Sequence, residues 1–427
     1  MDYKKSAYTL LIPMDQYTIA YNSYSGSLCK LDEKGVACLE NLDESSPFFN
    51  AMVGQGLIVD KHLDEFARVI REYNDYIRAD DPETLQYTIA LTTACNLRCI
   101  YCFEESHVPE YADQETMDAI VKYVRRELEA HPAVKNLHIT WFGGEPMLTY
   151  VQILTMSESL MEICKQQNVN YSASMISNGL LITEERLRKL HEYGLSSVQI
   201  TLDGSPEDCE MFKKGRKQDF EQLIRNLPVL NSICRIKVRL NACVDNLPGI
   251  LDMYRKLTQI TPPLSKVYIS KIEKYFDSCA DFTALTESDY TDLVGDMMQE
   301  ALSCGSNFQT ITRFPKRRKA YCGSMQKLSS AIGPDGSLYV CEHFIADKTH
   351  AIGNVRDDLP ANFKEDTEYV DFTAVPCHAG CAMCDMFPVC LGGCPANRLY
   401  HHIPVDCHQF RKNVKNELIL AAKNLVK

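Results

Sequence analysis

Long apolar runs, a secretory leader and an excess of basic residues are all missing from this sequence. No apolar stretch reaches the roughly 18 to 20 residues that a membrane-spanning helix needs. The N-terminal residues MDYKKSAYTLLIPMDQ contain no apolar core followed by a small-residue cleavage site. The net charge of -12 argues against a nucleic-acid-binding body. We therefore expect a cytoplasmic protein that has neither a membrane nor a nucleic acid as its partner.

Cysteine, by contrast, is abundant, because the 427 residues include 19 of them. Disulfides are rare in a reducing compartment, so clustered cysteines there more often bind metal. Three lie in the stretch LTTACNLRCIYCFEE, residues 91–105, and eight lie between Cys322 and Cys407. The other eight are scattered, and we interpret them as small buried hydrophobic residues.

Hydrophobic periodicity divides the chain into three predicted domains. Residues 1–80 read as short strands followed by helices, a pattern typical of a winged-helix-like module. Strands and helices alternate over residues 85–305. From residue 306 to 427 the periodicity weakens while cysteine density rises, which predicts a region organised by metal.

The middle region contains six successive β-α units, which predict a parallel sheet with right-handed crossovers. The strand candidates span residues 86–93, 136–144, 172–179, 197–204, 235–244 and 266–274. Six units fall short of a closed eight-fold barrel, so the expected fold class is α/β with a partial, open (β/α)6 TIM-like barrel. Polar or Gly-rich sequence follows several strands, at the end where such sheets place ligands.

The first cysteine cluster has the spacing C-x3-C-x2-C and follows a predicted strand. Three thiolates can hold a [4Fe–4S] cluster and leave one iron open, whereas a zinc site is disfavoured because no His pair follows. The stretch resembles the radical SAM superfamily. The resemblance implies that Cys95, Cys99 and Cys102 hold the cluster, and that its open iron chelates S-adenosylmethionine (SAM). An electron from the cluster then cleaves SAM to a 5′-deoxyadenosyl radical.

Further motifs follow successive strands: WFGGEP, ISNG, TLDG and VRLN. The glycines of the first permit close backbone approach, and its glutamate is an acceptor for a cationic group. The same resemblance implies that the cofactor-binding residues are Tyr101, Gly143, Gly144, Glu145, Pro146, Ser177 and Asn241. Glu145 would take the methionyl amino group, Ser177 would make a polar contact to SAM, and Asn241 would lie near the ribose. Tyr101 would flank the adenine. Asp203 could reach ribose or substrate and is the candidate catalytic residue.

The C-terminal cysteines carry a second resemblance. Thirteen residues separate Cys322 from Gly336, four separate Gly336 from Cys341, and a C-x2-C-x5-C-x3-C run precedes a last cysteine. This spacing resembles the SPASM extension of radical SAM enzymes, which implies two auxiliary iron–sulfur clusters. The first would take Cys322, Cys341 and Cys394, and the second would take Cys381, Cys384, Cys390 and Cys407. Either Cys377 supplies the fourth ligand of the first cluster, or its open iron takes a substrate thiolate. A structural zinc module is the alternative for the whole region.

Together these resemblances imply a maturase of ribosomally made peptides. It would hold three [4Fe–4S] clusters and SAM, receive electrons from a donor such as flavodoxin or ferredoxin, and install a thioether or carbon–carbon crosslink in a leader-bearing precursor peptide. Residues 1–80 look similar to the peptide-recognition module of such enzymes, with a structural cap as the alternative. Two other functions stay open: an anaerobic sulfatase-maturase-type enzyme that forms formylglycine, and a non-catalytic iron–sulfur electron carrier. The motif WFGGEP and the long β-α body argue against the carrier.

Three smaller features complete the sequence-based expectations. The basic run RFPKRRKAYC, residues 313–322, is interpreted as a solvated face or, more specifically, as a clamp for an acidic peptide or the SAM carboxylate. His401 and His402 are expected at the surface. Trp141 is expected to pack against the sheet.

Overall fold

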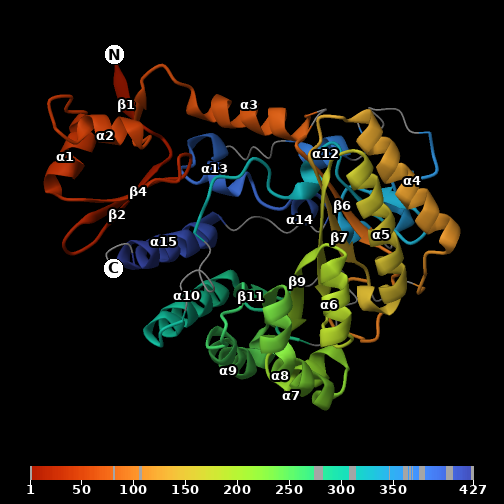
Figure 1. The fold of residues 1–427 in the computed structure, drawn as a ribbon. Coiled ribbons are helices and arrows are strands. Elements are labelled where there is room, and N and C mark those ends of the chain that lie inside the picture. Colours follow the sequence, from red (N-terminus) through yellow and green to blue (C-terminus); the bar gives the residue numbers. More distant parts are fainter. Residues whose placement is uncertain are drawn as a thin grey trace.

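The computed structural model describes residues 2–79, 82–104, 108–273, 282–306, 314–345, 347–358, 364, 367, 369–374, 380–400 and 407–424. In this part of the chain the strands form a nine-stranded, a three-stranded and a two-stranded sheet. Figure 1 shows the N-terminal module on one side and the large sheet with its helices on the other. No helix of the described segments is long and apolar enough to cross a membrane.

The large sheet contains the six parallel strands that the sequence predicts, in the order β11-β10-β9-β8-β7-β6. These are β6 (Thr84–Ala90), β7 (Asn136–Phe142), β8 (Asn170–Ser177), β9 (Leu195–Leu202), β10 (Arg235–Ala242) and β11 (Lys266–Lys271). The helices that follow them are α4 (Gln114–Ala130), α5 (Tyr150–Gln166), α6 (Glu184–Glu192), α7 (Pro206–Lys213), α8 (Lys217–Ile233), α9 (Leu247–Thr258) and α10 (Glu287–Ser303). Because β11 pairs only with β10 among the described strands, the barrel is open as expected.

Each barrel strand has one apolar and one polar face. The apolar face packs against the helices in the main core, which contains Trp141 as expected. The other face is lined by polar groups that pair across strands. His138 on β7 is hydrogen-bonded to the hydroxyls of Ser172 and Ser174 on β8 at 2.9 and 3.0 Å, and Tyr268 donates to Gln199 at 2.8 Å. The inner side of this barrel is therefore polar.

The N-terminal module has the predicted order of strands and helices, with one additional strand. Its elements are β1 (Tyr3–Lys5), β2 (Thr9–Pro13), β3 (Thr18–Asn22), β4 (Leu28–Leu31), α1 (Glu33–Asn41), α2 (Phe49–Gly54), β5 (Ile58–Asp60) and α3 (Glu65–Ile77). The strands β2, β3 and β4 form an antiparallel sheet, and β1 pairs with β5. One face of the three-stranded sheet packs against α1 and α2.

The opposite face of that sheet packs against the C-terminal helix α15 (Cys407–Asn424). Ile12 and Ile19 share a buried cluster with Val414 and Leu418, and Figure 1 shows α15 beside the N-terminal strands and α10. The Tyr21 hydroxyl donates to the Pro315 carbonyl at 2.7 Å. The first and last parts of the chain therefore share one core.

The region after residue 306, where the sequence periodicity weakens, contains short strands and helices that the sequence analysis did not predict. Strands β12 (Ser330–Ile332), β13 (Ser337–Tyr339) and β14 (Gly353–Asn354) extend the large sheet, and β12 pairs with β6 in parallel. These strands are too short for their periodicity to be recognised. The short helical elements are η3 (Gly323–Met325), η4 (Glu342–Phe344), η5 (Lys348–His350), α12 (Tyr369–Thr373), η7 (Cys381–Met383), α13 (Phe387–Cys390) and α14 (Pro395–Leu399).

The basic run of residues 313–322 makes contacts inside the protein as well as with solvent. Arg317 pairs with Glu72 on α3, and its guanidinium lies 4.1 Å from the ring centroid of Tyr24. Arg68 lies 3.7 Å from the same centroid. Arg317 is half-buried, so the interpretation of the run as a solvated face was wrong at this residue. Arg313, His401 and His402 lie outside the described residues.

Candidate functional site

A cavity of about 490 Å³ lies at the carboxyl ends of the barrel strands, where the sequence analysis expects a ligand. Its walls include eight of the predicted site residues, namely Cys95, Cys99, Tyr101, Cys102, Gly143, Gly144, Ser177 and Asn241. Three further predicted residues, Glu145, Pro146 and Asp203, are buried and are not among the residues that line the cavity. The structure therefore separates a cavity wall from the residues that support it.

The three cysteine thiols of the loop after β6 lie close to one another. Burial raises the pKa of Cys99 to about 11, and that of Cys102 to about 12, and neighbouring thiols add to both shifts. Thiols with such a pKa are neutral without a metal and lose their protons when they bind one. No group of three or more His, Cys, Asp or Glu side chains in the described segments is arranged around a single metal ion.

Gly143 and Gly144 bring the WFGGEP motif against the backbone just before Cys95. A Cβ at Gly143, whose φ is +123°, would lie 2.2 Å from the Thr92 carbonyl oxygen. A Cβ at Gly144 would lie 2.3 Å from the Ala94 carbonyl oxygen. The Gly144 amide donates to Thr92 and the Glu145 amide to Ala94, at 3.2 and 2.9 Å. The close approach that the glycines permit is thus to the cysteine loop itself.

Glu145 is fully buried, and its carboxylate accepts three hydrogen bonds from the protein. The Met147 amide and the Ser177 hydroxyl donate to Oε1 at 2.9 and 2.8 Å, and the Asn178 amide donates to Oε2 at 2.8 Å. Burial raises the pKa of Glu145, while these hydrogen bonds lower it. The carboxylate therefore joins the start of η1 (Pro146–Thr149) to the end of β8.

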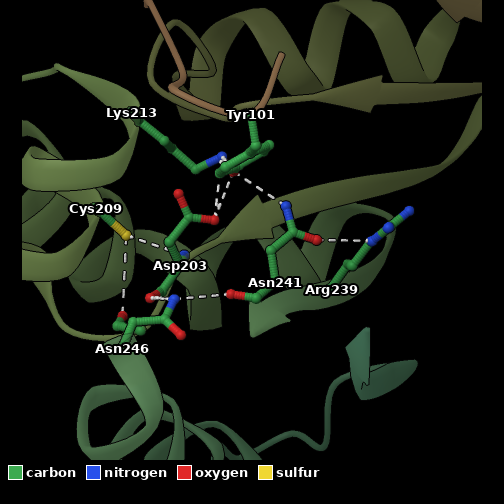
Figure 2. A network of polar contacts seen from close by, with 8 residues as sticks. Tyr101, Asp203, Cys209, Lys213, Arg239, Asn241 and Asn246 are labelled. Carbon is green, nitrogen blue, oxygen red and sulfur yellow. Dashed lines mark hydrogen bonds and ion pairs between the residues drawn. The ribbon is translucent and has the colours of Figure 1, made fainter. Parts of the chain in front are cut away.

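A buried polar network supports the cavity on the other side (Figure 2). The Tyr101 hydroxyl donates to Asp203 Oδ1 at 2.6 Å and accepts from Lys213 Nζ at 3.0 Å and Asn241 Nδ2 at 3.1 Å. Lys213 Nζ lies 3.7 Å from Asp203 Oδ1, and both side chains are almost completely buried. The Asn246 amide nitrogen donates to the Asp203 carbonyl oxygen at 2.7 Å and thereby fixes the end of β9.

The catalytic role of Asp203 stays a prediction, and the structure places its carboxylate among the residues that support the cavity wall. Its side chain is 0% exposed and lies next to Tyr101 and Lys213. Burial raises the pKa of Asp203, and the Lys213 ammonium together with hydrogen bonds from Tyr101 and Asn241 opposes that rise. Asp203 Oδ2 accepts no hydrogen bond within the described structure. The TLDG motif ends at the ligand side of the sheet, but its carboxylate contacts the cavity wall from the outside.

The two predicted sets of C-terminal cysteines stay a prediction, and the described cysteines of this region influence one another's pKa. Burial raises the pKa of Cys341 well above its usual range, and the neighbouring Cys322 and Cys394 add to the rise. Burial likewise raises the pKa of Cys390 to about 11, with contributions from Cys407, Cys384 and Cys381. Cys377 lies outside the described residues.

Several residues that line the cavity were missed by the sequence analysis. They are Asn178, Lys213, Arg239, Glu342 and His343. Asn178 and Arg239 stand inside the quoted motifs ISNG and VRLN, so a strand-by-strand reading could have found them. Lys213 has no local signal, because a lysine in a helical segment normally reads as exposed. Glu342 and His343 follow Cys341 directly and join the cavity to the first C-terminal cysteine set.

The donor set fits an iron–sulfur cluster with SAM. Three neighbouring thiols from one loop face the cavity, and that loop contributes no histidine to its lining. The cavity wall also contains the Ser177 hydroxyl and the side-chain amides of Asn178 and Asn241. Soft thiolate ligands select Fe–S clusters, Cu(I) or zinc.

Comparison with known proteins identifies the class. Residues 89–253 match the model of the Radical SAM superfamily. The chain is 23% identical over 333 residues to the serine-type anaerobic sulfatase-maturating enzyme of Klebsiella aerogenes, which covers 71% of this chain and 78% of that enzyme. The chain thus carries a radical SAM domain, and it is an enzyme related to the anaerobic sulfatase maturases.

Two groups of solved structures share the fold. Native anSMEcpe with bound AdoMet and a peptide matches with a TM-score of 0.57 at 19% identity, over 80% of this chain and 100% of that chain. Streptococcus suis SuiB bound to precursor peptide SuiA matches with a TM-score of 0.54 at 14% identity, over 92% of this chain and 95% of that chain. The partial barrel predicted from the sequence is therefore confirmed.

Proposed function

We propose that the chain is a radical SAM/SPASM maturase that installs a thioether or carbon–carbon crosslink in a ribosomally made precursor peptide. One observation carries the proposal. The cavity that Cys95, Cys99 and Cys102 line is also lined by Glu342, His343 and Asn397, which lie next to Cys341 or near Cys394 in the chain. A single cavity thus adjoins both the proposed SAM-binding cluster and the proposed first auxiliary cluster.

The proposed ligands follow from the placement of the thiols. Cys95, Cys99 and Cys102 would hold a [4Fe–4S] cluster whose open iron takes SAM, with Ser177 and Asn241 on the cavity wall beside it. When bound, this pair supplies a 5′-deoxyadenosyl radical that removes a hydrogen atom from an unactivated carbon. The chain's own residues bind, orient and exclude water. Two sets of contacts keep that wall rigid. Asp203 and Lys213 are hydrogen-bonded to Tyr101, and the paired glycines pack against the cysteine loop.

Two further [4Fe–4S] clusters are proposed for the C-terminal sets, one for Cys322, Cys341 and Cys394 and one for the other four cysteines. Either crosslink removes two hydrogens from the peptide: one leaves as an atom, and the other leaves as a proton and an electron. That proton comes from the cysteine thiol in a thioether and from a second carbon in a carbon–carbon crosslink. The auxiliary clusters would accept that electron, and a flavodoxin or ferredoxin would supply the electron that starts each turnover. Either Cys377 or a substrate thiolate would complete the first auxiliary set.

The N-terminal module is proposed to bind the leader of the precursor peptide. Both faces of its three-stranded sheet are covered, by α1 and α2 on one side and by α15 on the other. In the described structure the strands β2 and β4 each pair with β3 alone, so an added peptide strand would bind at one of these edges. The match over 92% of this chain to SuiB bound to precursor peptide SuiA supports this proposal, because that protein binds a precursor peptide.

The second candidate function is formylglycine formation in a sulfatase-like peptide. The sequence identity to the anaerobic sulfatase-maturating enzymes, whose matches cover 71% of this chain, favours it. A non-catalytic electron carrier is disfavoured, because such a protein needs no 490 Å³ cavity beside its cluster.

The test uses reconstituted enzyme, SAM, a reductant and a Cys-rich peptide encoded beside the gene, all without oxygen. We expect a product that has lost two hydrogens and resists a hydrazide reagent. Formylglycine would instead give an aldehyde that the hydrazide labels. An unmodified peptide together with turnover on a sulfatase-derived peptide would contradict the crosslinking proposal.

A further inference from the structure

Three basic residues lie in a row on the inner face of β10. Arg235, Lys237 and Arg239 alternate along the strand with Ile236, Val238 and Leu240, which are fully buried in the core against the helices. Successive side chains of a strand point to opposite faces, so the three cations share the barrel's polar side. In a protein with a net charge of -12, this row is a local reversal of charge.

The row extends from the main cavity into a second one. Arg239 lines the main cavity, and Lys237 lines a cavity of about 530 Å³ that shares Gln199 and Tyr290 with it. Burial lowers the pKa of His138 on β7, and the charges of Lys237 and Arg235 lower it further. These two cations therefore act across the inside of the barrel.

Arg239 differs from the other basic residues of the cavity wall in having no acidic partner. Lys213 is paired with Asp203, and Lys271 with Glu273 and Glu287. In the described part of the chain Arg239 makes one hydrogen bond, from Nε to Asn241 Oδ1 at 2.9 Å. Figure 2 shows the rest of its guanidinium extending away from the network.

The other two cations of the row also lack carboxylate partners among the described residues. Arg235 donates only to the Ser196 carbonyl, at 3.4 Å. Arg235 and Lys237 are exposed, whereas Arg239 is half-buried. The free-energy cost of burying a charge without a partner, which a bound anion removes, therefore applies to Arg239 alone. Glu417 is the single acidic side chain among the residues that line the second cavity.

The anion that fits Arg239 is a carboxylate, and two sources are available, SAM and the peptide. Lys213 is the cation next to the cysteine loop, since its Nζ donates to the Tyr101 hydroxyl at 3.0 Å. Arg239 lines the main cavity together with Tyr290 of α10, which also lines the second cavity. Arg239 therefore lies where the two cavities meet, which is the side that we assign to the substrate.

We propose that Arg239 and Lys237, with Arg235 at the end of the row, bind carboxylates of an acidic segment in the substrate peptide. The proposal rests on the proposed function, because it takes a peptide as the substrate. An extended peptide presents side chains on one face at every second residue, as β10 does, so acidic residues at alternate positions match the row. This row is separate from the basic run of residues 313–322, for which the acidic-peptide clamp stays a prediction.

The experiment measures equilibrium binding to the reconstituted full-length enzyme without oxygen. The probes are two fluorescein-labelled decapeptides, one in which alanine alternates with aspartate, and one with asparagine in place of each aspartate. Fluorescence anisotropy compares wild type, Arg239→Gln and the double variant Lys237→Gln/Arg239→Gln. The matched control is Arg225→Gln, which removes an exposed positive charge from α8, a helix on the opposite face of β10 from the row. SAM affinity is measured for each protein.

We expect the wild type and the control to prefer the aspartate peptide by at least about tenfold, the lower end of what charge-assisted hydrogen bonds give. The double variant should bind both peptides equally, and SAM affinity should not change. Equal binding of the two peptides by wild type would overturn the proposal, as would an undiminished preference in the double variant. A fall in SAM affinity in Arg239→Gln would assign this guanidinium to SAM and overturn its peptide role. Because binding is read without turnover, a failure to form product would contradict only the proposed function.

Discussion

The Tyr101 hydroxyl donates a 2.6 Å hydrogen bond to Asp203 Oδ1 and so ties the cysteine loop to the end of β9. Tyr101 stands between Cys99 and Cys102 and lines the cavity, whereas Asp203 does not. Lys213 completes the group from the last turn of α7. The position of two of the three loop thiols therefore depends on a buried ion pair.

From this relationship we predict that Asp203→Asn lowers the stability of the folded protein, instead of acting first on the chemical step. The substitution leaves the Lys213 ammonium buried without its counter-charge, which costs about 3–5 kcal/mol. Lys213→Met should cost a comparable amount, and the double variant Asp203→Asn/Lys213→Met should recover much of the loss. Urea unfolding of the four proteins measures the coupling. An Asp203→Asn enzyme that unfolds like wild type but forms no product would make Asp203 a catalytic residue after all.

A second prediction concerns Gly144→Ala. The new Cβ would lie 2.3 Å from the Ala94 carbonyl oxygen, so the backbone next to Cys95 must move. We expect the variant to lose iron from the loop site while the C-terminal sites keep theirs. Gly54→Ala is the control, since nothing lies within 4 Å of a Cβ there. Iron per chain after reconstitution is the readout, and equal iron in the two variants would speak against the glycine–loop contact.

A third prediction follows from the three hydrogen bonds of Glu145. Glu145→Ala leaves buried donors without acceptors, at about 1–3 kcal/mol for each donor. We expect lower resistance to urea together with weaker SAM binding, because Ser177 on the cavity wall loses its anchor. Isothermal titration with SAM and urea unfolding are measured on the same preparation. Weaker SAM binding with unchanged unfolding would place this carboxylate on SAM instead of in the fold.

A fourth prediction concerns removal of the N-terminal module. Deleting residues 1–62 uncovers Val414 and Leu418 on α15, which share a core with Ile12 and Ile19. Because Cys407 begins α15, we expect the truncated chain to aggregate or to lose iron from the second C-terminal set. A soluble, fully iron-loaded truncation would show that the two parts fold independently. Leader binding is therefore better followed in the intact chain, by hydrogen exchange at the amides of β2 and β4.

The barrel could be predicted from the sequence because its signals are local. The six strands alternate core residues with polar ones, in most cases over seven or eight positions. Capping residues mark where helices begin: the Asp113 side chain accepts a hydrogen bond from the Thr116 amide at 2.8 Å. The cysteine spacings are local as well, so the thiols that the structure brings together could be grouped in advance.

The supporting contacts could not be predicted, because they join distant segments. The direction of the Asp203 side chain depends on Lys213 and on Tyr101, which stands on a loop three strands earlier in the chain. The strand β12 forms only because β6 offers a free edge, and no periodicity announces a three-residue strand. The row on β10 was visible in RIKVRLNA, but its lack of acidic partners is a property of the folded chain.

The production of 5′-deoxyadenosine by two matched proteins tests the central claim most directly. Wild type and the triple variant Cys95→Ala/Cys99→Ala/Cys102→Ala are reconstituted with iron and sulfide without oxygen, and are given SAM and dithionite. We predict 5′-deoxyadenosine from wild type and none from the variant, which should keep the iron of its C-terminal cysteines. If the triple variant still forms 5′-deoxyadenosine, the loop after β6 is not the radical SAM site.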